Sequence, residues 1–147
     1  MDAFKIENYE REHGPGTFIP FRHLSESEAD QVLHSFKERL HLPVQSDYGD
    51  ISRVIFANSF VMKDVDAERE ELDLGSIVRQ LRFDAADLVY LNWYRFDKID
   101  ELRFVDLCEK FEDIWYPSSD DLDIFDRNMN WLISIEHSGS IRVLRIG

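Results

Sequence analysis

The densest group of chemically capable side chains is a run of carboxylates in the last third of the chain. Asp120, Asp121, Asp123 and Asp126 fall within seven residues. Carboxylates this close repel one another unless a cation, a basic partner or water separates them. Alternation along a strand places Asp121 and Asp123 on one face. The run therefore predicts a contact surface for a basic partner, a weak cation site or a charged sheet edge that prevents edge-to-edge pairing.

A cation site would require more ligands than this run supplies. A calcium loop needs a central glycine and a bidentate glutamate at its last position, and no glycine follows Asp121 before Gly139. We therefore expect no tight calcium site. Magnesium held by two or three of these acids would still need a phosphate ligand to complete its coordination. We assign no metal and no cofactor to the chain.

Histidine and cysteine offer one further arrangement. None of the five histidines has a second histidine at metal-ligand spacing, but His137 follows Glu136 at a predicted turn. The single cysteine, Cys108, lies on the apolar stripe of a predicted helix, where a small buried side chain is usual. No nucleophile elbow, P-loop or glycine-rich dinucleotide motif is present. The alternative function is thus a carboxylate-based, magnesium-dependent or metal-free enzyme using Asp120, Asp121 and Asp123 with Glu136 or His137.

Large aromatic residues accompany the acids. They are Trp93, Tyr94, Phe96, Trp115, Tyr116, Phe125 and Trp131. Trp93 and Trp131 lie in apolar strand patterns and are expected in the core, whereas Trp115 and Tyr116 precede Pro117 and are expected at the surface. Aromatic residues beside acids form interface hot spots facing a basic partner. The predicted partner-binding residues are Trp115, Tyr116, Asp120, Asp121, Asp123 and Asp126.

The charge of the chain is large and uneven. Thirty acids against 17 bases give a net charge of −13 over 147 residues. Residues 1–60 carry −4, residues 61–126 carry −11 and residues 127–147 carry +2. Such a surface repels phosphate backbones and anionic membranes, so we expect neither nucleic acid nor a membrane as a partner. A basic protein is favoured, although a solubilising role would also explain the acidity.

The clearest predicted element is a helix over residues 25–42. Ser25 and Glu28 have the spacing of a capping box. Apolar residues then recur along one helical stripe: Ala29, Val32, Leu33, Phe36 and Leu40. Pro43 ends the helix, because the residue before a proline avoids helical backbone angles.

The rest of the first half is less regular. Residues 1–24 contain Gly14-Pro15-Gly16 and are predicted to form turns around short extended pieces. The apolar spacing of residues 51–65 fits either two strands or one helix, and residues 67–81 predict a helix with Leu74, Ile77, Val78 and Leu81 on one face.

The second half predicts an antiparallel sheet. Residues 88–96 are rich in strand formers on both faces and suit a central strand. Asp97 is expected to cap a helix that buries Phe104, Leu107, Cys108, Phe111 and Ile114. Residues 122–125 form a short strand, and Ser138-Gly139 turns a hairpin with strands near 131–137 and 140–146. The expected fold is a single α+β domain over residues 1–147, with helices on one face of a mostly antiparallel sheet and a C-terminal β-meander.

A resemblance adds to this interpretation. The stretch from Trp115 to Asp121, with Ile124-Phe125-Asp126, Trp131 and His137-Ser138-Gly139, resembles small acidic bacterial immunity proteins of polymorphic or contact-dependent toxin systems. It covers about the last 35 residues. The resemblance implies a protein that neutralises a basic toxin domain, usually a nuclease, and it carries over no catalytic motif.

Three functional hypotheses follow. The first is an immunity-type inhibitor that uses its acids and aromatics against a basic partner. The second is the carboxylate-based enzyme, and the third is a scaffold whose acidity only confers solubility. With no apolar stretch resembling a signal peptide or a membrane span, we expect a cytoplasmic location.

Overall fold

The computed structural model describes residues 1–84, 87–93 and 95–147, so Tyr94 lies outside the described residues. These residues form six helices and seven strands. The order is α1 (Ala3–His13), β1 (Phe21–His23), α2 (Glu26–Arg39), α3 (Tyr48–Asn58), β2 (Phe60–Val61), α4 (Leu74–Gln80), β3 (Leu88–Asn92), β4 (Ile99–Arg103), α5 (Phe104–Glu109), α6 (Phe111–Ile114), β5 (Leu122–Asp126), β6 (Trp131–Ile135) and β7 (Ile141–Arg145).

All seven strands join one antiparallel sheet in the order β1-β4-β3-β5-β6-β7-β2. The expected central strand is β3, which pairs with β4 on one side and β5 on the other. The expected C-terminal meander is β5, β6 and β7, with Ile124 opposite Ile133 and Ile133 opposite Val143. The α+β class and the antiparallel sheet are confirmed.

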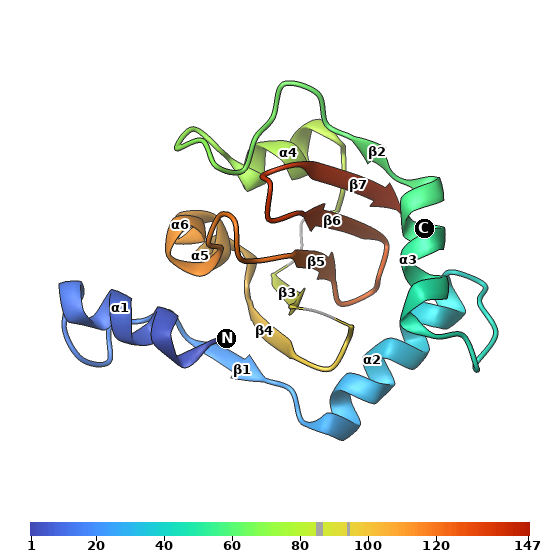
Figure 1. The fold of residues 1–147 in the computed structure, drawn as a ribbon, viewed down its shortest axis with the longest axis horizontal. Helices are drawn as coiled ribbons and strands as arrows, with labels where there is room; N and C mark the ends of the chain where they lie inside the picture. The colour runs from blue at the N-terminus through green and yellow to red at the C-terminus, as the bar shows by residue number, and fades with distance from the viewer. Residues whose placement is uncertain (85–86, 94) are drawn as a thin grey trace.

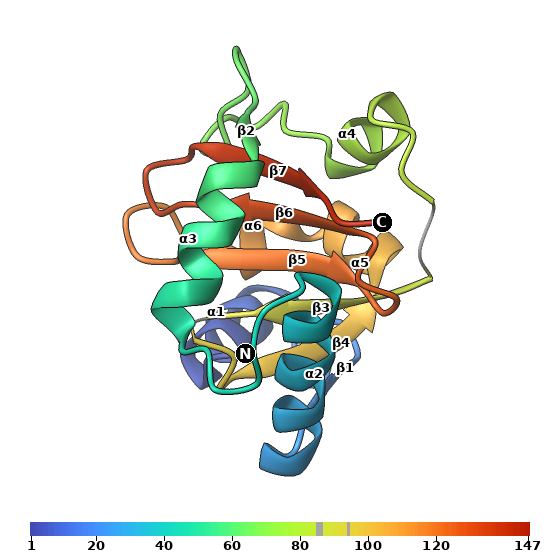
Figure 2. The ribbon, with the colours of Figure 1, turned by 90° about the vertical axis from the view of Figure 1, so that its right-hand side faces the viewer.

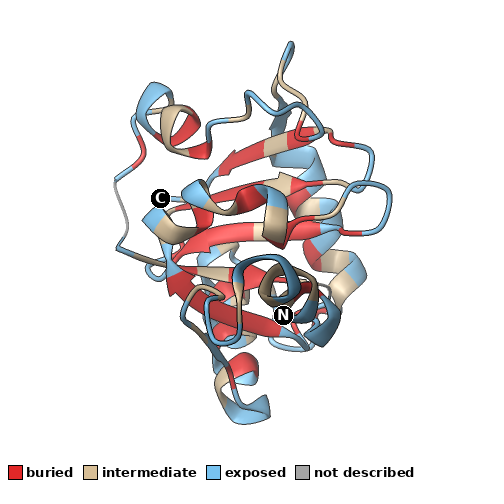
Figure 3. Ribbon diagram, turned by 90° about the vertical axis from the view of Figure 1, so that its left-hand side faces the viewer, coloured by how far each residue is buried: buried red, intermediate tan, exposed pale blue. Residues whose placement is uncertain are grey.

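Helices cover both faces of this sheet, where the sequence predicted one. On one face, α4, α5 and α6 pack on apolar side chains such as Val89, Ile124 and Ile133. On the other face, α2 and α3 pack on Phe125 and Leu132. Figures 1 and 2 show the sheet between these two groups, with α1 on the side of α5 and α6. Figure 3 shows buried strands behind helices whose outer sides are exposed.

Capping explains where the two helices on the second face begin. The Ser25 hydroxyl accepts the Glu28 N–H while the Glu28 carboxylate accepts the Ser25 N–H, as predicted. Asp47 and Asp50 form the same reciprocal pair at the start of α3. Residues 51–65, whose apolar spacing fits either two strands or one helix, contain one of each. The helix α3 continues to Asn58, and the two-residue strand β2 follows.

The first helix was missed because its inward residue is a lysine. In α1, Lys5 is buried and the neighbouring Phe4 is 44% exposed. Apolar periodicity, which assumes that apolar residues face the core, therefore fails on residues 1–24.

Two predicted helices were placed wrongly. The helix over residues 67–81 begins only at Leu74, because acids crowd residues 64–73 and Asp73 caps the helix by accepting the Ser76 N–H. Asp97 caps no helix; the chain there enters β4, whose Asp100 and Glu101 are buried. Charged residues inside a buried strand concealed it.

The C-terminal hairpin is confirmed with a loop one residue longer than expected. The Gly139 N–H donates to Glu136 O, and the Glu136 N–H donates to Ser140 O. Gly139 has a φ of 90°, the left-handed conformation that closes such a loop. A β-carbon at Gly139 would also collide with Asp66 Oδ1, so a larger residue would displace the Asp66 side chain as well as strain the turn.

Emptying the core beneath α2 should be costly. Phe36 is fully buried, with its ring 5.1 Å from that of Phe96 and 5.3 Å from that of Phe125. We expect Phe36→Ala to lower the free energy of unfolding by ~3–5 kcal/mol, the range for an emptied aromatic site. Urea denaturation measures this. As the control, Phe56→Ala on α3, where the ring is 63% exposed, should cost ~0.5 kcal/mol or less; equal losses would refute the packing.

Candidate functional site

The six predicted partner-binding residues do not form one surface. Trp115, Asp120 and Asp126 are buried. Tyr116 and Asp123 are partly exposed, and Asp121 is exposed. The expected exposure of Trp115 is therefore wrong, and the acidic run is divided between internal contacts and the surface.

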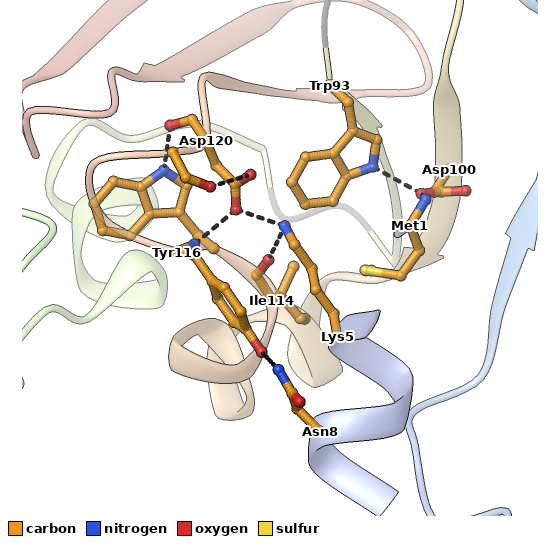
Figure 4. A network of polar contacts seen from close by, with 10 residues as sticks. Met1, Lys5, Asn8, Trp93, Asp100, Ile114, Tyr116 and Asp120 are labelled. Carbon is orange, nitrogen blue, oxygen red and sulfur yellow. Dashed lines mark hydrogen bonds and ion pairs between the residues drawn. The ribbon is translucent and has the colours of Figure 1, made fainter. Parts of the chain in front are cut away.

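Asp120 is the partner of a buried lysine that sequence reasoning missed. Lys5 Nζ lies 2.5 Å from Asp120 Oδ2 and donates to Ile114 O at 2.8 Å. The ammonium also lies 4.0 Å from the centroid of the Trp93 ring and 5.1 Å from that of Tyr116 (Figure 4). Burial lowers the pKa of Lys5, and the hydrogen bond and charge of Asp120 oppose that shift.

Asp120 also holds the predicted aromatic pair, Tyr116 through its carboxylate and Trp115 through its backbone carbonyl. Asp120 Oδ2 accepts the Tyr116 N–H at 2.7 Å, and Trp115 Nε1 donates to Asp120 O at 2.9 Å. Trp115 also stacks on Phe111, which draws it into the core. Trp115 and Asp120 are thus structural, because they close the loop between α6 and β5 over α1.

Asp126 is also used internally. Its Oδ1 accepts the N–H groups of Asn130 and Trp131 at 2.7 and 3.2 Å. A carboxylate that caps a tight turn in this way satisfies amides that the β5–β6 connection leaves unpaired. It offers no surface to a partner.

The remaining two acids line a recess at the end of the sheet beside α3. The recess has a volume of about 280 Å³ and is lined by Tyr48, Ser52, Trp93, Asp121, Asp123, Ser134, Ile135, Glu136 and His137. His137 Nδ1 lies 2.9 Å from Asp121 Oδ1, which also accepts the His137 N–H. The structure thus brings together Asp121, Asp123, Glu136 and His137 from the enzyme hypothesis, but not Asp120.

Asp123 is the unusual carboxyl group in this recess. Burial raises the pKa of Asp123 to about 6, and hydrogen bonds from Ser134 and Asn92 only partly oppose the shift. Asn92 Nδ2 donates at 3.1 Å. The side chain is partly exposed through the recess although protein surrounds its other sides. A cationic group entering the recess would meet a carboxyl group that is ionised at neutral pH but poorly solvated.

A second acidic segment packs against the same turn. The loop over residues 63–73 carries six acids and two bases. It is held to the β6–β7 turn by the Ala67 N–H, which donates to Gly139 O at 2.9 Å. A β-carbon at Gly139 would lie 3.1 Å from Glu68 Cγ. We call Asp66, Glu68, Asp121, Asp123 and Glu136 the acidic end of the molecule.

Large apolar side chains are exposed near the acidic end. Phe56, at the end of α3, is 63% exposed, and Phe60 and Val61 of β2 are 51% and 42% exposed. Arg142 lies 4.1 Å from the centroid of the Phe56 ring and pairs with Glu136 at 3.4 Å. Sequence reasoning missed these residues, because an apolar run in an ambiguous segment is first assigned to the core.

Comparison of the chain with protein-family models, curated proteins and solved structures finds no match. Within the described residues, no three or more His, Cys, Asp or Glu side chains are grouped so that they would hold a metal ion. No helix in the described part of the chain has the length and apolarity to span a membrane.

Removing the partner of Lys5 should be strongly destabilising. We expect Asp120→Ala to lower the free energy of unfolding by ~3–5 kcal/mol, because it leaves an uncompensated buried charge. Asp121→Ala is the matched control, since this neighbouring side chain is 53% exposed; losing its hydrogen bond from the His137 N–H should cost roughly 1 kcal/mol or less. Urea denaturation of both variants decides the matter. If Asp120→Ala were as stable as Asp121→Ala, Lys5 would not depend on this ion pair.

The raised pKa of Asp123 predicts that its own contribution to stability falls as the pH rises. In the folded state Asp123 holds its proton up to about pH 6, whereas an ordinary unfolded aspartate releases it near pH 3.8. The contribution of Asp123 to stability is therefore lost as the pH rises from about 4 to 6. Asp123→Asn, which cannot ionise, should be more stable above that range by roughly 1–3 kcal/mol, and the difference should disappear toward pH 4. A difference independent of pH between 4 and 7.5 would contradict this.

Proposed function

We propose that this chain is an acidic protein-binding module whose partner is a basic protein. The observation that carries the proposal is the acidic end, where carboxylates from the 63–73 loop, the start of β5 and the β6–β7 turn lie on one part of the molecule. Arg142 reaches this end of the molecule, but it is already paired with Glu136, and the 63–73 loop sets six acids against two bases. A basic surface would supply the missing positive charge.

The electrostatics of such a surface favour fast and selective association. Opposite potentials speed diffusional encounter and disfavour wrong partners. Phe56, Phe60 and Val61 supply apolar area beside the charge, which long-lived binding needs. The net charge of −13 continues to disfavour nucleic acid and anionic membranes as partners.

We further propose that the binding is inhibitory and of the immunity type, acting in the cytoplasm on a basic toxin domain. The resemblance of the segment from Trp115 to Gly139 supports this narrower proposal. Part of that segment, Trp115 and Asp120, has a structural role here. The contacts with a toxin would therefore come from Asp121, Asp123, Glu136 and the neighbouring 63–73 loop.

Charge reversal at the acidic end tests the proposal. The partner is first recovered by pull-down from the source cell, and binding kinetics are then measured at two salt concentrations. Glu68→Lys and Asp121→Lys should each slow association about tenfold at low salt and weaken its salt dependence, since exposed charges act mainly on the association rate. Asp30→Lys, on the exposed side of α2, is the charge-matched control.

Two results would contradict the proposal. One is a partner whose association rate is indifferent to salt and to both substitutions. The other is a basic partner that Glu68→Lys and Asp30→Lys affect equally, because net charge alone would then explain binding. For the immunity-type proposal, the chain must also abolish the toxic activity of the partner at a one-to-one ratio.

A further inference from the structure

The two edges of the sheet are built differently. At one edge, β1 carries Arg22, which pairs with Glu28 at 2.5 Å, and His23, which lies 2.9 Å from Asp100. Charged side chains on an edge strand oppose pairing with another chain. This edge is therefore protected against pairing with a strand of another chain.

The other edge, β2, has no charged residue within its two positions. Phe60 lies opposite Val143 and Val61 opposite Arg142, so their side chains project to opposite faces of the sheet. Val61 thus shares a face with Arg142 and with the Phe56 ring that Arg142 contacts. An apolar side chain is exposed on each face of this edge.

One residue of β2 directs its backbone N–H and C=O away from the sheet. The Met62 N–H donates to Ile141 O of β7 at 2.9 Å. Neighbouring residues of a strand direct their backbone groups to opposite edges, so the N–H and C=O of Val61 point away from β7. Both groups are placed to pair with an added strand.

We propose that the outer edge of β2 receives an extended, lysine- or arginine-rich segment of the basic partner as an eighth strand. This proposal rests on the proposed function and names the contact through which it acts. The occupant is argued from charge complementarity, because β2 leads directly into the 63–73 loop with its six acids and two bases. A second copy of the chain is a poor occupant, since it would bring a second net charge of −13 to the same edge.

Strand addition divides recognition between backbone and side chains. Backbone hydrogen bonds to Val61 provide affinity for any extended segment, and the side chains on each face provide selectivity. Depending on its register, an apolar residue of the segment would contact either Phe60 on one face or Phe56 with Val61 on the other. Its basic residues would face Asp66 and Glu68.

A synthetic peptide of alternating lysine and valine tests the edge directly. On titration, we expect the NMR resonances of residues 56–68 to shift and the exchange of the Val61 amide hydrogen to slow. A peptide of alternating glutamate and valine, and an N-methylated lysine–valine peptide that cannot pair, are the controls. Neither control should bind.

Substitution at Val61 separates strand pairing from charge. Val61→Pro removes the outward N–H while leaving the Met62 bond to β7, and it should weaken peptide binding about tenfold. Val61→Thr keeps the N–H and the branched shape and should bind like the wild type. Thermal unfolding confirms that both variants remain folded.

The outcomes distinguish this proposal from the proposed function. Saturable binding with shifts confined to the recess near Asp121 and Asp123 would overturn the edge proposal and leave the protein-binding function standing. No saturable binding of the lysine–valine peptide at millimolar concentration would also overturn the edge proposal, while partner kinetics decide the function separately. A wild-type dimer that Val61→Pro converts to a monomer would show that the occupant is a second copy.

Discussion

The seven-stranded antiparallel sheet has apolar side chains on both faces, so helices must cover each face. This requirement organises the whole chain. The helices α2 and α3 meet it on one face, while α4, α5 and α6 meet it on the other. Helix α1 closes the remaining corner through a lysine, so the cover there depends on an ion pair. Buried charges need such partners, because desolvation otherwise exceeds any gain.

The same requirement divides the acids into two populations. Asp100, Glu101, Asp120 and Asp126 are buried and accept hydrogen bonds or ion pairs that hold strands, turns and α1 in place. Asp66, Glu68, Asp121, Asp123 and Glu136 lie at one end of the sheet. Net charge alone therefore overstates the surface available to a partner. The acids that remain available are concentrated at the acidic end, which borders apolar side chains on α3 and on the edge strand β2.

Local signals predicted the elements whose causes are local. The capping box of α2 and the glycine turn between β6 and β7 follow from a few neighbouring residues, and both were predicted. The role of Asp120 could not be predicted, because its partner Lys5 lies 115 residues earlier. Helix α1 was missed for the related reason that its buried residue is charged. In β4, Asp100 and Glu101 concealed a buried strand in the same way.

Part of the candidate site was predictable and part was not. Alternation correctly placed Asp121 and Asp123 near one another, and the turn brought Glu136 and His137 to the same recess. The docking of the 63–73 loop on Gly139 and the exposure of Phe56 and Phe60 depend on tertiary packing. No periodicity in a single sequence reports such packing.

Hydrogen exchange of the free and partner-bound chain, read by mass spectrometry, tests most directly whether the acidic end is the contact surface. The account predicts slower exchange in residues 60–68 and 134–140 when the basic partner is bound, with residues 3–13 and 26–39 unchanged. Slowing confined to α1 or α2, or no change at the acidic end despite saturating partner, would contradict it.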